Sequence, residues 1–175
     1  MLNNYSNLQK QLNDFINAVI ISAKDNLQRS DKIASGSLSN SMYNSGIKIM
    51  PNSLEIGLIQ NDYGAFIDKG VSGTQKRYDT IYSYKDKMPP VKAIDKWLYD
   101  RGIAPRNKKG QFVKRMSTAF AIAKNIQKYG IEPSHYLSDA VQENKAILPE
   151  ELRSAFALDV QGMVDFIIRT NKKRK

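Results

Sequence analysis

The chain of 175 residues contains no cysteine and only one histidine. The lack of cysteine excludes disulfides, thiolate metal sites and cysteine nucleophiles, and a single histidine leaves few ligands for zinc. The longest apolar stretch, from Phe15 to Ile21, is interrupted by Asn17 and falls far short of the ~20 residues that a membrane-spanning helix needs. We therefore expect a protein without cofactor or metal that does not enter a membrane.

The N-terminus also lacks a basic flank followed by an apolar block, so we expect no secretory signal and synthesis in the cytoplasm. Hydrophobic residues make up 41% of the chain and charged residues 25%, which suits one ordinary globular domain. We expect this domain to cover residues 1–171, with exposed loops at 71–87 and 104–115 and a basic tail at 172–175.

The net charge of +10 is concentrated in the middle third of the chain. Residues 76–128 hold fourteen Lys/Arg against four Asp, whereas the flanking segments are neutral. Such asymmetry favours an acidic partner, either nucleic-acid phosphate or a carboxylate-rich protein surface. A solvated basic face that only aids solubility is the alternative. The candidate contact residues belong to residues 104–115, here called the basic insert: Arg106, Lys108, Lys109, Lys114 and Arg115.

Apolar spacing predicts long amphipathic helices near both ends, one from Leu2 to Leu27 and one beginning at Pro149 with Leu152, Phe156, Val160, Met163, Val164 and Ile167 on its apolar face. Alternating apolar residues on either side of a turn at residues 51–53 predict a β-hairpin. Shorter helices are expected at residues 38–42, 91–98, 116–129 and 136–141. The expected fold class is α+β, with a small antiparallel β-sheet packed with long N- and C-terminal amphipathic helices and shorter helices between them.

No combination of residues indicates catalysis. His135 follows Pro133 and Ser134 without a second histidine nearby, which favours a capping or packing role. Asp62 and Asp68 are separated by six positions with no third carboxylate close by, unlike the clusters that metal-dependent nucleases need. We therefore expect no enzyme.

The glycines and the single tryptophan do not indicate a binding site either. The glycines at 70, 73 and 110 lack the strand and helix context of a phosphate-binding loop. Trp97 is expected to pack in the core on the apolar face of its helix.

Three separated stretches of the chain resemble short sequence motifs. Residues 34–42, Ala-Ser-Gly-Ser-Leu-Ser-Asn-Ser-Met, resemble a Thr-Gly-x-Leu-x-x-Ser-Ile pattern, with Ser35 at the threonine position. Residues 61–70 resemble a Tyr-Ala-x-Tyr-Val-Glu-x-Gly pattern, with Phe66 and Asp68 at the aromatic and acidic positions. Residues 133–137, Pro-Ser-His-Tyr-Leu, resemble a Pro-x-x-Phe-Leu element.

In this order, over residues 30–140, the motifs resemble those of the small tail-component and tail-completion proteins of siphophage-like viruses, the HK97 gp10-like family. The loop at 71–87 and the basic insert are longer than a minimal member needs, and the final helix lies outside the match. The residues that the resemblance marks as structural are Ser35, Gly36, Leu38, Ser41, Tyr63, Phe66, Asp68, Gly70, Pro89, Pro90, Trp97, Gly102, Gly130 and Pro133. For Tyr63, Phe66 and Gly70, core packing and a turn are the expected roles.

The resemblance implies a non-enzymatic structural protein of a tailed bacteriophage. It would be made in the host bacterial cytoplasm and would join the virion at the neck, as a homo-oligomeric ring of six copies around the DNA path. Its partners would be the portal-side connector or stopper, tail proteins and, without sequence preference, packaged DNA. Two alternatives remain: a free non-specific nucleic-acid-binding protein, and another virion part such as a tail terminator or minor head protein.

Overall fold

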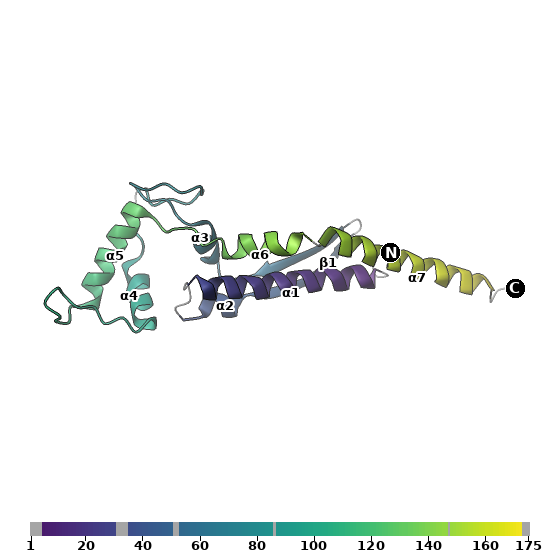
Figure 1. The fold of residues 1–175 in the computed structure, drawn as a ribbon, viewed down its shortest axis with the longest axis horizontal. Helices are drawn as coiled ribbons and strands as arrows, with labels where there is room; N and C mark the ends of the chain where they lie inside the picture. Colours follow the sequence, from purple (N-terminus) through teal and green to yellow (C-terminus); the bar gives the residue numbers. More distant parts are fainter. Residues whose placement is uncertain (1–4, 31–34, 51–52, 86, 147, 173–175) are drawn as a thin grey trace. The chain divides into compact units, whose positions relative to one another are not determined.

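The computed structural model describes residues 5–30, 35–50, 53–85, 87–146 and 148–172 (Figure 1). Within this part of the chain it contains seven helices and one two-stranded antiparallel sheet, which confirms the α+β class. The expected turn residues Pro51 and Asn52 and the end of the basic tail, 173–175, lie outside the described residues. The elements are α1 (Ser6–Arg29), α2 (Ser37–Ser41), β1 (Tyr43–Met50), β2 (Ser53–Ile59), α3 (Gly64–Lys69), α4 (Val91–Asp100), α5 (Arg115–Tyr129), α6 (Tyr136–Lys145) and α7 (Leu148–Lys172).

The chain divides into two compact units, and each is described by itself. Unit 1 comprises residues 1–25, 42–59 and 137–175, and unit 2 comprises residues 26–41 and 60–136. The single domain over residues 1–171 stays a prediction.

Unit 1 is built on the buried face of α1. Ile16, Val19, Ile20 and Ala23 are buried at the steps of three and four residues that place them on one side of a helix. The hairpin pairs β1 with β2 antiparallel and is irregular between Asn44 and Ile47. The Asn44 amide donates a hydrogen bond to the side chain of Asn13 at 3.0 Å, which joins the hairpin to α1.

The start of α1 is capped by a side chain of α7. Asp159 is 4% exposed, and its carboxylate accepts hydrogen bonds from the backbone N–H groups of Asn7 and Leu8, both at 3.0 Å. The side-chain amide of Asn7 adds a third at 2.8 Å. First-turn N–H groups have no partner inside their own helix, and the positive end of the helix dipole favours an anion. Asp159 therefore stabilises a helix that begins about 150 positions earlier in the chain.

The final helix was predicted from its apolar spacing and is present as α7, but part of the expected buried face is exposed. Phe156, Val160 and Val164 are exposed, whereas Ala155 and Asp159 are buried. The hydrogen bonds of Asp159 to the first turn of α1 fix which side of α7 faces that helix. The ring of Phe156 also stacks on Tyr5, with the ring centres 5.8 Å apart, so a polar contact and one residue of the apolar stripe together orient α7.

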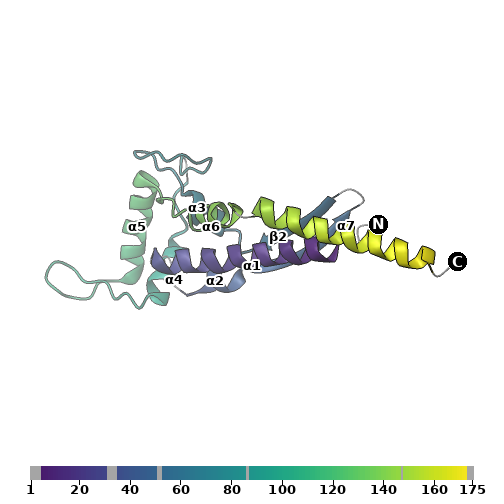
Figure 2. The same ribbon diagram turned by 45° about the vertical axis from the view of Figure 1, so that its right-hand side comes forward.

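Unit 2 contains a helical hairpin in which α4 and α5 lie side by side (Figure 2). Its buried centre consists of Ile94 and Leu98 on α4 and Ala119 and Ala123 on α5. The small alanine side chains let the two helices approach closely. The expected core position of Trp97 was wrong: this residue is 41% exposed, because Ile94 and Leu98 occupy the buried face, and the Arg101 guanidinium lies 5.8 Å from its ring centre.

Candidate interaction surface

The three motif stretches meet in unit 2. The backbone N–H of Asn61 donates to the Ser41 hydroxyl at 3.0 Å, and this contact connects residues 35–42 with residues 61–70. The Ser134 hydroxyl donates to the Ile67 carbonyl at 2.8 Å, and the His135 N–H donates to the Asp68 carbonyl at 3.0 Å. Residues 35–42, 61–70 and 133–137, which are widely separated in sequence, are therefore connected by hydrogen bonds. This contact region is here called the joint.

Two glycines let the backbones approach at this joint. Val71 and Ile131 exchange both backbone hydrogen bonds, each at 2.8 Å. A Cβ atom on Gly130, where φ is +77°, would lie 2.1 Å from the Val71 oxygen, and a Cβ atom on Gly70, where φ is +70°, would lie 2.6 Å from the Ile131 oxygen. Only glycine combines these backbone angles with such close approach. The motif positions Gly70 and Gly130 are thus explained by the geometry of the joint.

The loop at residues 71–87 was expected to be exposed, but its first three residues are buried. Val71, Ser72 and Gly73 are buried, because they pair with the chain around Ile131 and with the later part of their own loop. The N–H of Ser72 donates to the Tyr82 carbonyl at 2.9 Å, and the N–H of Tyr84 donates to the Ser72 carbonyl at the same distance. The loop is therefore joined to the motif residues by backbone hydrogen bonds.

Tyr136 is the most enclosed side chain of the joint. It is fully buried, and its hydroxyl donates to the Gln60 side-chain oxygen at 2.7 Å. Burial disfavours the charged phenolate and raises the pKa of Tyr136 to about 12, although the hydrogen bond with Gln60 opposes this shift. Tyr136 belongs to one of the motifs expected from the sequence, whereas no sequence signal connects Gln60 to it.

The aromatic motif residues Tyr63 and Phe66 were expected in the core, and this was wrong. They are 42% and 41% exposed, because α3 turns Gly64 and Asp68 inward. The ring of Phe66 contacts Tyr82 edge to face, with the ring centres 4.6 Å apart. The exposed Phe66 and the half-buried Tyr82 thus form an aromatic pair.

The remaining motif residues lie near helix ends of unit 2. Ser35, Gly36 and Leu38 surround the start of α2, where Leu38 is buried. Pro90 caps the start of α4 and Pro89 before it is buried. Gly102 (φ +66°) ends α4, and its N–H donates to the Tyr99 carbonyl at 2.9 Å. Pro133 lies against Gly70 in the joint.

The residues considered for catalysis do not form a site. Asp68 is buried whereas Asp62 is exposed, and the exposed His135 has an uncommon positive φ of 53°. In the described part of the chain, no group of three His, Cys, Asp or Glu side chains is placed to hold a metal ion. Likewise, no helix among the described residues is long and apolar enough to cross a membrane.

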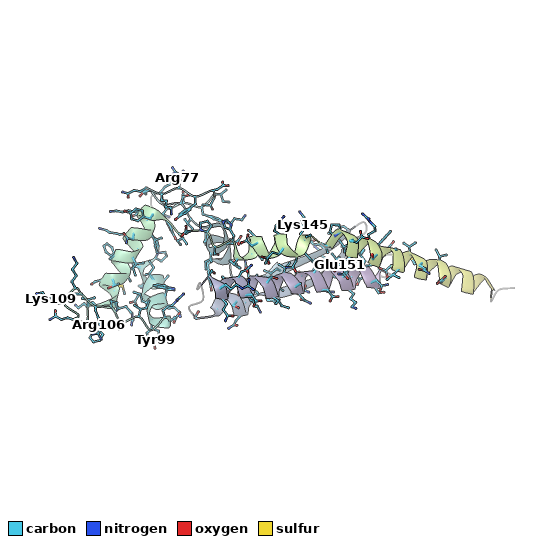
Figure 3. All side chains as sticks on the ribbon, viewed as in Figure 1. Arg77, Tyr99, Arg106, Lys109, Lys145 and Glu151 are labelled. Carbon is cyan, nitrogen blue, oxygen red and sulfur yellow. The ribbon has the colours of Figure 1, made fainter. Side chains whose placement is uncertain are left out.

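The basic insert has its own hydrogen-bonded structure. The Asn107 side-chain oxygen accepts hydrogen bonds from the backbone N–H groups of Lys109 and Gln111 at 2.9 and 3.0 Å. The guanidinium of Arg106 lies 4.1 Å from the ring centre of Phe112 across the insert. Figure 3 shows Arg106 and Lys109 at the end of this loop. Lys108 and Lys114 are exposed as well, so the insert presents its cations to solvent.

Arg115, the last candidate contact residue, is engaged within unit 2. Its guanidinium forms two hydrogen bonds with the Asp95 carboxylate, at 2.7 and 3.2 Å, and lies 5.4 Å from the ring centre of Tyr99. The hydrogen bond from Arg115 lowers the pKa of Asp95. Arg115 thus joins the first turn of α5 to α4, and its role in binding a partner stays a prediction.

The charge is unevenly divided between the units. Unit 2 holds seventeen Lys/Arg against eight Asp/Glu, a net charge of +9, and unit 1 accounts for the remaining +1. A charge imbalance of this kind attracts acidic partners to one part of a protein.

Large apolar side chains are exposed in both units. They include Ile81, Tyr99 and Phe112 in unit 2 and Phe156 and Leu158 in unit 1.

Comparison with known proteins found no matching family model, no similar curated protein and no similar solved structure.

Proposed function

We propose that this protein is a structural component of a tailed bacteriophage particle, and that it completes the tail at the neck as a homo-oligomeric ring of six copies. The observation that carries the proposal is the series of motifs at residues 35–42, 61–70 and 133–137. Their order resembles that of tail-completion proteins, and the three stretches are joined by hydrogen bonds in unit 2. Motifs that occurred by chance would not be expected to share one joint.

Assembly into a ring suits the surface of the chain. Heterologous contacts between identical copies close when the rotation between neighbours completes a circle, and each copy then buries one face against the next. The exposed apolar side chains of each unit supply surface for such contacts. Portal-side connector or stopper proteins and tail proteins would cover the ends of the ring.

Imaging of intact particles tests the proposal. We expect the protein in purified virions, in a ring at the junction of head and tail, and we expect its deletion to leave unjoined heads and tails. Isolated copies elsewhere in the particle, or absence from virions, would contradict the proposal. A ring at the far end of the tail or inside the head would favour a tail terminator or a minor head protein.

A pair of variants tests the motif surface within the same assay. Phe66→Ser alters an exposed motif residue, and Ile81→Ser, at 86% exposure, alters an exposed apolar residue outside the motifs. Both should fold, because neither side chain is buried. We expect Phe66→Ser to impair the joining of heads and tails and Ile81→Ser to leave it unchanged. If Ile81→Ser impairs the joining of heads and tails and Phe66→Ser does not, the motif surface is not needed for assembly.

A free, non-specific nucleic-acid-binding protein is the second candidate, and the net charge of +9 on unit 2 favours it. This function needs no place in a particle. Presence in the virion would therefore support the first candidate, whereas absence from virions together with binding to cellular nucleic acid would support the second.

A further inference from the structure

The strongest unassigned feature of unit 2 is a long segment without carboxylates. Residues 101–131 contain eight Lys/Arg and no Asp or Glu, and this segment includes the whole of α5. The cations of the basic insert account for part of this charge. Lys124 and Lys128, on α5 itself, were not among the residues that the sequence analysis proposed as contacts.

The helix presents its cations on the side that faces away from α4. Ser117, Ala121, Lys124 and Lys128 follow one another at steps of four, three and four, and so lie on one face of the helix. All four are exposed, whereas Ala119 and Ala123 on the opposite side are buried against α4. Lys114, at the N-cap position of α5, is exposed three residues before Ser117.

These lysines form a row along the helix, here called the α5 lysine face: Lys114, Lys124 and Lys128. At 1.5 Å per residue the row is about 21 Å long. The ammonium group of Lys124 lies 5.1 Å from the ring centre of Phe120, which holds this cation at the surface of the helix. Ser117 and Asn125, both exposed, add neutral hydrogen-bond donors beside the lysines.

Further cations flank both ends of the row. The basic insert directly precedes α5 in the chain. At the other end, the Lys128 carbonyl accepts backbone hydrogen bonds from Gln75 at 2.8 Å and Lys76 at 3.3 Å, which brings Lys76 and Arg77 next to the last turn of α5. Figure 3 shows Arg77 near one end of α5 and Arg106 and Lys109 beyond the other end. Cations therefore lie at both ends of the exposed face of α5, with uncharged residues between Arg115 and Lys124.

We propose that the α5 lysine face binds the phosphate backbone of double-stranded nucleic acid without reading its sequence. Phosphates of one strand follow one another at about 3.4 Å along the duplex axis, so a row of about 21 Å spans roughly six base pairs. Lysine, serine and asparagine are among the side chains that most often contact phosphate oxygens. The face carries no carboxylate that would repel the backbone. This inference rests on the second candidate function and deepens it, because it names the surface that would bind the nucleic acid. Its failure would leave the first candidate, a component of the particle, untouched.

The test compares two triple variants of the full chain that remove the same charge. The first carries Lys114→Gln, Lys124→Gln and Lys128→Gln. The control carries Lys10→Gln, Lys48→Gln and Lys145→Gln, three exposed lysines of unit 1. Binding of a labelled random-sequence duplex of about 20 base pairs is measured by fluorescence anisotropy over a range of salt concentrations. Circular dichroism establishes that both variants keep the wild-type helix content.

We expect the wild-type affinity to fall steeply with salt, and the lysine-face variant to lower the slope of log K against log salt by roughly 2.7, at about 0.9 for each phosphate that a lysine no longer neutralises. Its affinity at low salt should fall at least tenfold, while the control keeps the wild-type slope. Equal weakening by both variants would show that only total charge matters and would overturn the proposal. No binding by the wild type, or equally tight binding of polyglutamate, would also overturn it, the latter in favour of an acidic protein partner. Since the assay uses no particles, its outcome is independent of the location of the protein in virions.

Discussion

Replacement of Gly130 by alanine tests the joint between the motif stretches most directly. Gly130 has a φ of +77°, and an added Cβ would lie 2.1 Å from the Val71 oxygen and 2.7 Å from the Gly73 nitrogen. Both neighbours are backbone atoms, so they cannot move aside as a side chain does. The joint would have to open around the two hydrogen bonds between Val71 and Ile131.

Gly110 provides a matched control. Its φ is +78°, nearly the same, but a Cβ there meets no atom within 4 Å. An L-residue at positive φ costs at least about 1 kcal/mol at either position, and at Gly130, where ψ is −166°, the backbone lies in a region that is essentially restricted to glycine. At Gly130 the loss of two backbone hydrogen bonds adds about 2 kcal/mol, at roughly 1 kcal/mol each. We therefore expect Gly130→Ala to lower the free energy of unfolding by at least about 3 kcal/mol and Gly110→Ala by about 1 kcal/mol.

Urea unfolding followed by circular dichroism measures the difference between the two variants. Amide hydrogen exchange locates it, because exchange at Val71 and Ile131 should be faster in Gly130→Ala but not in Gly110→Ala. If the two variants are destabilised equally, or if exchange at these two amides does not change, the close packing of residues 71–73 against 128–131 is refuted.

The buried polar groups and the backbone of the two units give three further predictions. Asp159→Ala should lower the free energy of unfolding by about 2–4 kcal/mol, because it leaves the first turn of α1 without its acceptor, whereas the exposed Asp165→Ala should have little effect in the same urea titration. Burial in the folded protein raises the pKa of Tyr136 from 10.0 to about 12, so this group contributes stability that is complete below pH 10 and is lost as the pH rises through 12. The melting temperature should therefore fall over this pH range, and it should fall less in Tyr136→Phe. His135→Ala should cost about 1 kcal/mol, because alanine tolerates the φ of 53° less well than histidine does, and should leave particle assembly intact; loss of function in a normally folded variant would revive the enzyme hypothesis.

The helices and the hairpin were predictable because their signals are local. Apolar residues at steps of three and four marked α1, α4, α5 and α7, and alternation marked the two strands. The helix α3 was not predicted, since its six residues are too few to show a period. Its orientation instead follows from the hydrogen bonds that Ser134 and His135 make with its last residues.

The candidate site was predictable only in part. The sequence alone determines the charge, including the absence of carboxylates from residues 101–131, and the order of the motifs. It also determines that glycines occur at 70 and 130, but the reason for them lies in a backbone that approaches from about 60 residues away. Partners such as Gln60 for Tyr136 have no sequence signal, because hydrogen bonds between distant segments leave no periodicity.

Tertiary structure decided which predicted faces are buried. The apolar spacing of α7 permitted burial of Phe156 and Val160, yet Asp159 is the buried residue, because the unpaired N–H groups at the start of α1 require an acceptor, and Phe156 stacks on Tyr5 while remaining exposed. Trp97 is exposed because Ile94 and Leu98 occupy the face of α4 that packs against α5. In the same way, the sequence determined how many lysines α5 carries, and the packing of Ala119 and Ala123 against α4 decided that Lys124 and Lys128 face solvent together.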